Sequence, residues 1–119
     1  NYKYIKERKQ KATGIDDFQE VYSALNSAAN KWFDLGVVLG INYDKLKNIK
    51  SDNNSVVECL SEMLAHWLQT SPSRTWTDIC NGLRSDTVQL IVLADKIEKE
   101  IAMEVYIYTY NLSKLLKLV

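Results

Sequence analysis

The sequence has few residues that interrupt helices. It contains four Gly and one Pro among 119 residues, so long stretches of backbone can stay helical without a break. Its apolar runs are much shorter than the roughly 20 residues with which a helix crosses a bilayer. The chain is 46% hydrophobic and 25% charged, as globular domains are, and a chain of this length buries about two thirds of its unfolded surface. We therefore expect one all-helical domain that folds by packing alone.

Cysteine and histidine are also scarce, which limits the chemistry that the chain can perform. Neither Cys59 nor Cys80 has a second Cys or His at the spacing of a zinc site. We expect both to be buried free thiols, as in proteins of the reducing cytoplasm, and we expect no metal or cofactor. The one histidine, His66, follows Glu62 by a helical turn, and we interpret the two as an exposed pair on a helix. The alternative is a small enzyme that uses Glu62 and His66 in acid–base catalysis.

Neither sign of charge dominates the whole chain, but positive charge is concentrated at the N-terminus. The 15 basic residues are matched by 15 acidic ones, which argues against a chain-wide phosphate-binding surface. Residues 1–14 nevertheless have a charge of about plus four, from Lys3, Lys6, Arg8, Lys9 and Lys11 against Glu7. Such an arm can attract nucleic acid or acidic lipid, so a helical nucleic-acid-binding module is an alternative function. We favour a solvated leader, because the segment is short and lacks an apolar face. The chain begins at Asn1 rather than Met, which is compatible with excision from a longer protein.

Capping residues and apolar spacing divide the chain after residue 14 into six helical segments. Asp17, Ser55 and Thr75 each stand three positions before an acid, the pattern of a capping box, and mark three helix starts. We predict helices over residues 18–29, 32–39, 43–50, 55–70 and 76–83 and from about residue 88 onward, with a loop over residues 51–54. The residues predicted to face inward are Phe18, Val21, Tyr22, Leu25, Ala29, Trp32, Leu35, Leu39, Leu46, Ile49, Val56, Val57, Leu60, Met63, Leu64, Trp67, Leu68, Trp76, Ile79, Cys80, Leu83, Val88, Ile91, Ala94, Ile97 and Ile101.

The segment from Lys31 to Ile41 is the most informative part of the chain. Trp32, Leu35 and Leu39 are three and four residues apart, so they share one face of a helix. Gly40 then supplies the left-handed residue that commonly ends a helix. No Lys-Ser or Lys-Thr follows these glycines, as a phosphate-binding loop would require. The segment is therefore predicted to be a core helix followed by a stop.

Four groups of residues, in order along the chain, carry a resemblance to a known family. They are Trp32-x-x-Leu35-Gly36-x-x-Leu39-Gly40-Ile41, Leu46-x-x-Ile49, Met63-Leu64-x-x-Trp67-Leu68 and Thr75-Trp76-x-x-Ile79-x-x-x-Leu83. In this order, the sequence from about Asp16 to Ile101 resembles a death domain. The resemblance implies a compact antiparallel Greek-key bundle of six helices that has no enzymatic activity. It also implies an adaptor- or receptor-type module for intracellular signalling, as in apoptosis or innate immunity, that binds other death-domain proteins or itself. Residues 1–14 would then be a basic leader, 15–101 the bundle and 102–119 an apolar C-terminal extension.

Charge suggests which surfaces of such a module would bind a partner. In the resembled family, a face from helices one and four meets a face around helix two of the next domain. Here the first of these regions is acidic, and the second, residues 31–50, is mainly basic with two acids, Asp34 and Asp44. Opposite charges on the two regions favour head-to-tail contact, which gives open helical assemblies unless a ring closes. The candidate partner-binding residues are Asp17, Glu20, Glu58 and Glu62 on the acidic side and Lys31, Asp34, Lys45, Lys47 and Lys50 on the other.

Residues 102–119 lie beyond the resemblance. Ile101, Val105, Tyr108, Leu112, Leu115 and Val119 follow one another at intervals of four and three residues, the spacing of a helical seam. This spacing predicts that the last helix continues through the extension. The alternative is a strand, because residues 105–110 are uncharged and are mostly β-branched or aromatic. The apolar seam of such a helix would pack on the bundle, on the Tyr2-x-Tyr4-Ile5 part of the leader, or on another chain.

Overall fold

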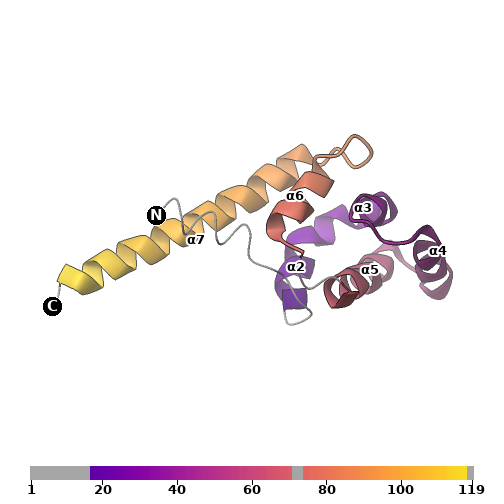
Figure 1. Cartoon of the computed structure of the whole chain (residues 1–119), viewed down its shortest axis with the longest axis horizontal. Coiled ribbons are helices and arrows are strands. Elements are labelled where there is room, and N and C mark those ends of the chain that lie inside the picture. The colour runs from indigo at the N-terminus through magenta and orange to yellow at the C-terminus, as the bar shows by residue number, and fades with distance from the viewer. Residues whose placement is uncertain (1–16, 71–73, 118–119) are drawn as a thin grey trace.

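The computed structural model describes residues 17–70 and 74–117, and these ranges are mainly helical. The predictions for residues 1–14, and for Val119 in the seam, lie outside the described residues. Figure 1 shows a cluster of helices at one end and a long helix, α7, that extends away from it. The elements in chain order are α2 (Phe18–Leu25), the 3₁₀ helix η2 (Asn26–Lys31), α3 (Trp32–Val38), α4 (Tyr43–Asp52), α5 (Val56–Thr70), α6 (Trp76–Leu83) and α7 (Ile91–Lys117).

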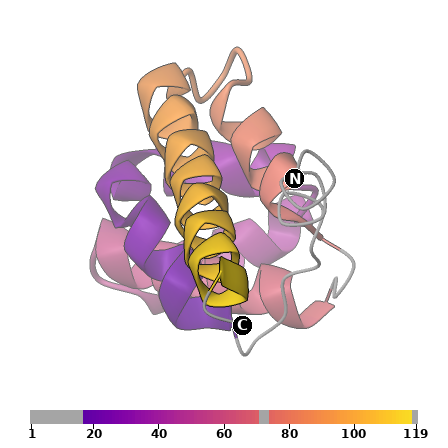
Figure 2. The same ribbon diagram turned by 90° about the vertical axis from the view of Figure 1, so that its left-hand side faces the viewer.

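Helix α5 is the central element of the bundle, as its wide apolar stripe predicts. It packs against α2, η2, α3 and α4, while α6 packs against α3 and α7. Figure 2 shows α7 in front of the bundle formed by the other helices. The described residues therefore bury their apolar faces against one another in a helical bundle.

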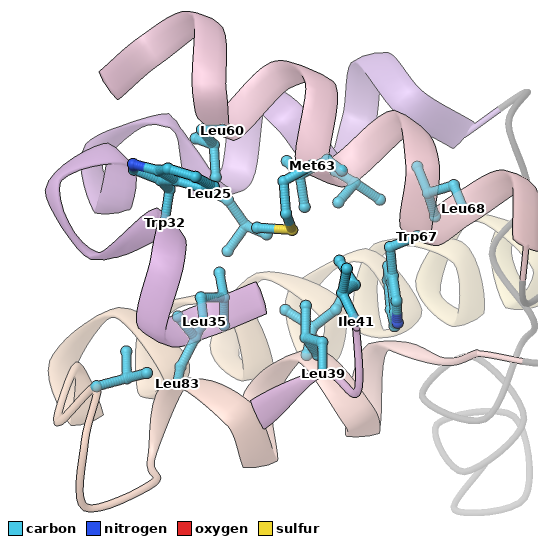
Figure 3. Close-up of a cluster of buried hydrophobic side chains, with 14 of the residues drawn as sticks. Leu25, Trp32, Leu35, Leu39, Ile41, Leu60, Met63, Trp67, Leu68 and Leu83 are labelled. Carbon is cyan, nitrogen blue, oxygen red and sulfur yellow. The ribbon is translucent and has the colours of Figure 1, made fainter. Parts of the chain in front are cut away.

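One continuous core joins the helices, and most of the predicted inward faces are confirmed. Figure 3 shows Met63 of α5 among side chains of the neighbouring helices. Trp32 and Trp67 are only 6% and 1% exposed, so each indole ring is buried. Phe18 and Tyr22 are half-buried against this core, and three predicted core residues are exposed: Val56, Val57 and Ile91, by 42%, 46% and 53%. Each of these three stands in the first two residues of its helix, where fewer neighbouring turns cover a side chain.

The three predicted helix starts use their capping residues to different extents. Thr75 forms a complete capping box with Asp78 at the start of α6. Before α5, Ser55 Oγ accepts a hydrogen bond of 3.2 Å from the Glu58 amide and donates one of 3.0 Å to the Glu58 carboxylate. Asp17 precedes α2 as predicted, but its side chain makes no capping hydrogen bond there. The start is therefore in the predicted place, although the predicted cap is wrong for this helix.

Three predicted boundaries shift by a few residues, and the first is the start of the last helix, which was predicted at about residue 88 and lies at Ile91. The helix expected over residues 18–29 becomes 3₁₀ from Asn26 onward, in a stretch where Asn and Ser side chains compete for backbone hydrogen bonds. Helix α4 continues to Asp52, beyond the predicted start of the loop. In the added turn the hydroxyl of Ser51 donates a hydrogen bond of 3.1 Å to the carbonyl of Lys47, one turn earlier, instead of ending the helix.

The stop predicted at Gly40 is a hydrogen-bonded helix end. Gly40 has φ of +89°, in the left-handed region that glycine adopts at little cost. Its amide bonds to the carbonyl of Val37 over 3.0 Å, and the amide of Ile41 bonds to the carbonyl of Gly36 over 3.0 Å. This pair of bonds is a Schellman motif, which satisfies carbonyl groups left over at the end of α3.

Helix α7 confirms the helical alternative for the extension and contradicts the strand. It runs without a break from Ile91 to Lys117, roughly 40 Å at the usual rise per residue. Its buried residues are Ala94, Ile97, Ile101 and Val105. From Tyr106 to Leu116 the apolar residues are at least 43% exposed. In the described ranges, no helix is both long and apolar enough to cross a membrane.

Candidate interaction surfaces

The acidic candidates come from two helices that pack together. Asp17 precedes α2 and Glu20 lies in its first turn, while Glu58 and Glu62 are one turn apart on α5. Because α2 packs on α5, the structure brings these two helices side by side. Glu20 and Glu58 are exposed, whereas Asp17 and Glu62 are half-buried. Glu20 and Glu58 therefore offer the more accessible carboxylates of this region.

Glu62 has a structural contact that the sequence did not reveal. Its Oε2 accepts a hydrogen bond of 2.9 Å from Asn53 Nδ2, at the end of α4. The same amide group donates a bond of 2.8 Å to the carbonyl of Ile49. Asn53 therefore joins the end of α4 to the middle of α5, with Glu62 as one acceptor.

Lys50 belongs to the same neighbourhood as the carboxylates of α5. Burial is the main cause that raises the pKa of the Cys59 thiol, and Glu62 and Glu58 raise it further. Lys50 acts on the same pKa in the opposite direction. These three charges therefore lie within electrostatic range of one buried thiol.

His66 is not the exposed residue that the sequence predicts, because it is half-buried, as Glu62 is. Burial is the main cause that lowers the pKa of His66, Lys45 lowers it further, and Glu62 opposes both. The carboxylate of Glu62 is engaged by Asn53. The interpretation of Glu62 and His66 as a simple exposed pair is therefore wrong. The structure also brings Lys45 into the neighbourhood of His66.

The other candidate surface combines lysines with aromatic side chains. The rings of Phe33 on α3 and Tyr43 on α4 meet edge to face at 5.8 Å, and Lys47 Nζ lies 5.5 Å from the Tyr43 ring centre. Tyr43 is 60% exposed. Lys31, at the end of η2, is also exposed, whereas Asp34 is half-buried. Phe33 and Tyr43 were not among the predicted binding residues, although Lys47 follows Tyr43 by one helical turn in the sequence.

Arg84 forms a contact between α6 and α7 that the sequence analysis also missed. Its Nη2 donates a hydrogen bond of 2.7 Å to Asp95, and its Nη1 donates one of 2.8 Å to Glu98. These bonds are the main cause that raises the pKa of the guanidinium. Asp95 and Glu98 are three residues apart on α7, so one guanidinium reaches both. This contact fixes the beginning of α7 against the bundle.

The two cysteines are buried and free, as predicted. Cys80 Sγ lies 4.0 Å from the carbonyl oxygen of Ala94, where α6 meets α7. No group of three or more His, Cys, Asp or Glu residues within the described part of the chain is arranged to hold a metal ion. The candidate surfaces expose charged groups and aromatic rings on a helical scaffold.

Taken together, these features define a helical bundle that exposes charged and aromatic side chains. The family model described as "Death domain" matches residues 16–101, and the chain belongs to the death-domain family. The family assignment made from the core motifs is thereby confirmed. Death domains are non-enzymatic interaction modules of signalling pathways, and they bind other death-domain proteins. No curated protein and no solved structure matches the chain.

Proposed function

We propose that this domain assembles head to tail with like domains, either its own copies or other death-domain proteins, in cytoplasmic signalling. Residues 15–101 are the interaction domain in this proposal, preceded by a basic leader over 1–14 and followed by an extension over 102–119. Family membership supports the general role. The observation that supports the particular arrangement is the pair of exposed surfaces described above, one acidic and one built from lysines and aromatic rings.

The two surfaces complement each other in charge and in composition. Glu20 and Glu58 provide exposed negative charge, while Lys31 and Lys47 provide exposed positive charge, and Lys47 lies over the ring of Tyr43. Aromatic residues are enriched in protein interfaces because they bury a large area with little loss of side-chain freedom. Charge pairs between chains add orientation and association rate more than affinity. Lys45, Lys50 and Glu62 contribute less in this proposal, because they lie in one another's neighbourhood within the chain.

Charge reversal tests the proposal. We expect the wild-type chain to form concentration-dependent oligomers that weaken with salt, measured by sedimentation velocity and light scattering. Glu58→Lys and Lys31→Glu should each reduce assembly, and a mixture of the two variants should restore association, because each then offers one intact surface to the other. Both should remain folded, since single surface ion pairs contribute about 0 to 1 kcal/mol.

Matched controls separate a specific surface from a general change in charge. Asp86→Lys and Lys99→Glu alter exposed residues outside both surfaces and should leave assembly unchanged. A wild-type chain that stays monomeric at high concentration and low salt would exclude self-association. The proposal would then require that this chain bind a different death-domain protein through the same two surfaces. Equal losses in the controls and in the surface variants would contradict the proposed arrangement.

A further inference from the structure

An acidic groove lies where α7 passes α2 and η2. Its volume is about 360 Å³, and Glu20 lines it from α2. Glu100 and Glu104 line it from α7, with Lys96 nearby. Trp76, which is 4% exposed, adds apolar surface. The groove therefore combines a net negative charge with an apolar component, which suits a basic peptide that also carries apolar side chains.

The same side of α7 becomes apolar beyond the groove. Tyr108 and Leu115 follow Glu104 by four and eleven residues, so the three side chains lie along one side of the helix. Tyr108 is 52% exposed and Leu115 is 61% exposed. Figure 1 shows that this part of α7 extends away from the other helices. A ligand lying along α7 would therefore meet acidic side chains near the bundle and apolar ones farther out.

The N-terminal leader has the complementary order. Going back from Asp17, where the described part begins, the sequence first gives Lys11, Lys9 and Arg8 and then Ile5, Tyr4 and Tyr2. The cluster of Arg8, Lys9 and Lys11 is thus nearer to the domain, and the apolar residues are farther away, where Lys3 and Lys6 alternate with them. Tyr2 and Tyr4 alternate, so an extended chain presents both on one side.

The dimensions of the two partners also agree. From Glu104 to Leu115 is about 16 Å along a helix. From Arg8 to Tyr2 is about 20 Å in an extended chain. The leader joins the domain at the start of α2, the helix that contributes Glu20 to the groove. The leader can therefore reach the groove and the apolar stretch beyond it.

We propose that the basic leader binds along α7 of its own chain, with Arg8, Lys9 and Lys11 at the acidic groove and Tyr2, Tyr4 and Ile5 over the apolar stretch beyond Glu104. A tethered segment is favoured over a separate chain because a short linker holds it at an effective concentration of about the millimolar range. Because charge, order and length match, this proposal replaces the interpretation of residues 1–14 as a solvated leader, which composition alone favours. Of the three possible partners of the apolar seam, which are the bundle, the leader and another chain, the proposal selects the leader.

A spin label on α7 tests this contact in the full-length chain. Ser113 is exposed near the end of α7, and Cys59 and Cys80 are 5% and 2% exposed, so a label attached to Ser113→Cys reacts there selectively. We expect the label to broaden the NMR signals of residues 2–5. A label on Asp86→Cys, before the start of α7, should not affect them. Sharp, unbroadened signals of residues 2–5 with the Ser113→Cys label would overturn the proposal.

Isotope mixing distinguishes the chain's own leader from that of a second copy. When spin-labelled chain without ¹⁵N is mixed with unlabelled ¹⁵N chain, broadening at residues 2–5 of the ¹⁵N chain would mean contact between copies and would overturn the intrachain proposal. We expect no broadening in this mixture.

Charge reversal tests the groove by an independent route. Glu100→Lys with Glu104→Lys, or Lys9→Glu with Lys11→Glu, should each reduce the broadening caused by the label on Ser113→Cys, and high salt should act in the same direction. Combining both pairs of reversals should restore the broadening. Melting temperatures close to that of the wild type would show that the domain stays folded. Unchanged broadening in both reversed pairs would overturn the assignment of the acidic groove.

Discussion

Asn53, at the end of α4, donates a hydrogen bond of 2.9 Å to Glu62 of α5 and so joins two helices that are separate in the sequence. The same side chain also bonds to the carbonyl of Ile49. We predict that Asn53→Ala lowers the free energy of unfolding by about 1 to 2 kcal/mol, because two hydrogen bonds are lost, one of them to a charged group. Urea unfolding measures the change.

The adjacent residue provides a matched control for this prediction. Asn54 is exposed, so Asn54→Ala should change the free energy of unfolding by less than about 0.5 kcal/mol. Equal effects of the two substitutions would contradict a structural role for the contact between Asn53 and Glu62.

Two glycines of the Trp32 segment are required for different physical reasons. A Cβ on Gly36 would lie 2.6 Å from Leu46 Cδ2, in a fully buried contact between α3 and α4. A Cβ on Gly40 would meet Arg74 Nη2 at 3.7 Å, so the obstacle there is the positive φ. We predict costs of about 1 to 3 kcal/mol for Gly36→Ala and about 1 to 2 kcal/mol for Gly40→Ala.

A double-mutant cycle with Leu46→Val separates these two causes. Valine has no Cδ atoms, so Gly36→Ala should cost less in the Leu46→Val background than in the wild type. The cost of Gly40→Ala should not change. If Leu46→Val relieved neither substitution, the proposed steric cause at Gly36 would be wrong.

The buried tryptophans should dominate the stability of the core. We predict that Trp32→Ala and Trp67→Ala each cost about 3 to 5 kcal/mol, as large-to-small changes in a packed core do. Such a loss can unfold a domain of ordinary stability, so thermal melting followed by circular dichroism is a suitable measurement. Val92→Ala, at a residue that is 83% exposed, serves as the control and should melt as the wild type does. An unchanged melting temperature in either tryptophan variant would contradict the observed packing.

The sequence predicted the features that depend on local spacing. Leu60, Met63 and Trp67 repeat with the helical period, and one face of α5 buries all three. The stop at Gly40 was predictable in the same way, because few other residues adopt its conformation readily. Family membership followed from the order of such local signals along the chain.

Contacts between distant segments were not predictable from local spacing. Arg84 reaches Asp95 and Glu98 across the turn from α6 to α7, and nothing near Arg84 in the sequence marks these partners. The proximity of Lys45 to His66 likewise depends on how α4 packs on α5. The candidate surfaces could therefore be assigned only from the structure, which distinguishes exposed charged residues such as Lys31 from those with neighbours within the chain.

His66 should make stability depend on pH. Its pKa is lowered from 6.5, mainly by burial and further by Lys45, so the folded state disfavours the protonated ring. The unfolded chain then takes up a proton more readily, and stability falls as the pH drops below 6.5 through the folded pKa. Above that range His66 is neutral in both the folded and the unfolded state, so its titration does not lower the free energy of unfolding.

We therefore predict that the wild type loses more stability than His66→Gln between about pH 7.5 and about pH 5.5, where histidine titrates. Urea unfolding of both proteins at the two pH values gives the difference, and carboxylates that titrate in both proteins cancel in it. Lys45→Gln should raise the pKa of His66 in an NMR titration, because it removes a nearby positive charge. Equal losses of stability in the wild type and in His66→Gln would mean that His66 has the same pKa in the folded and unfolded states, contrary to its partial burial and to the nearby charge of Lys45.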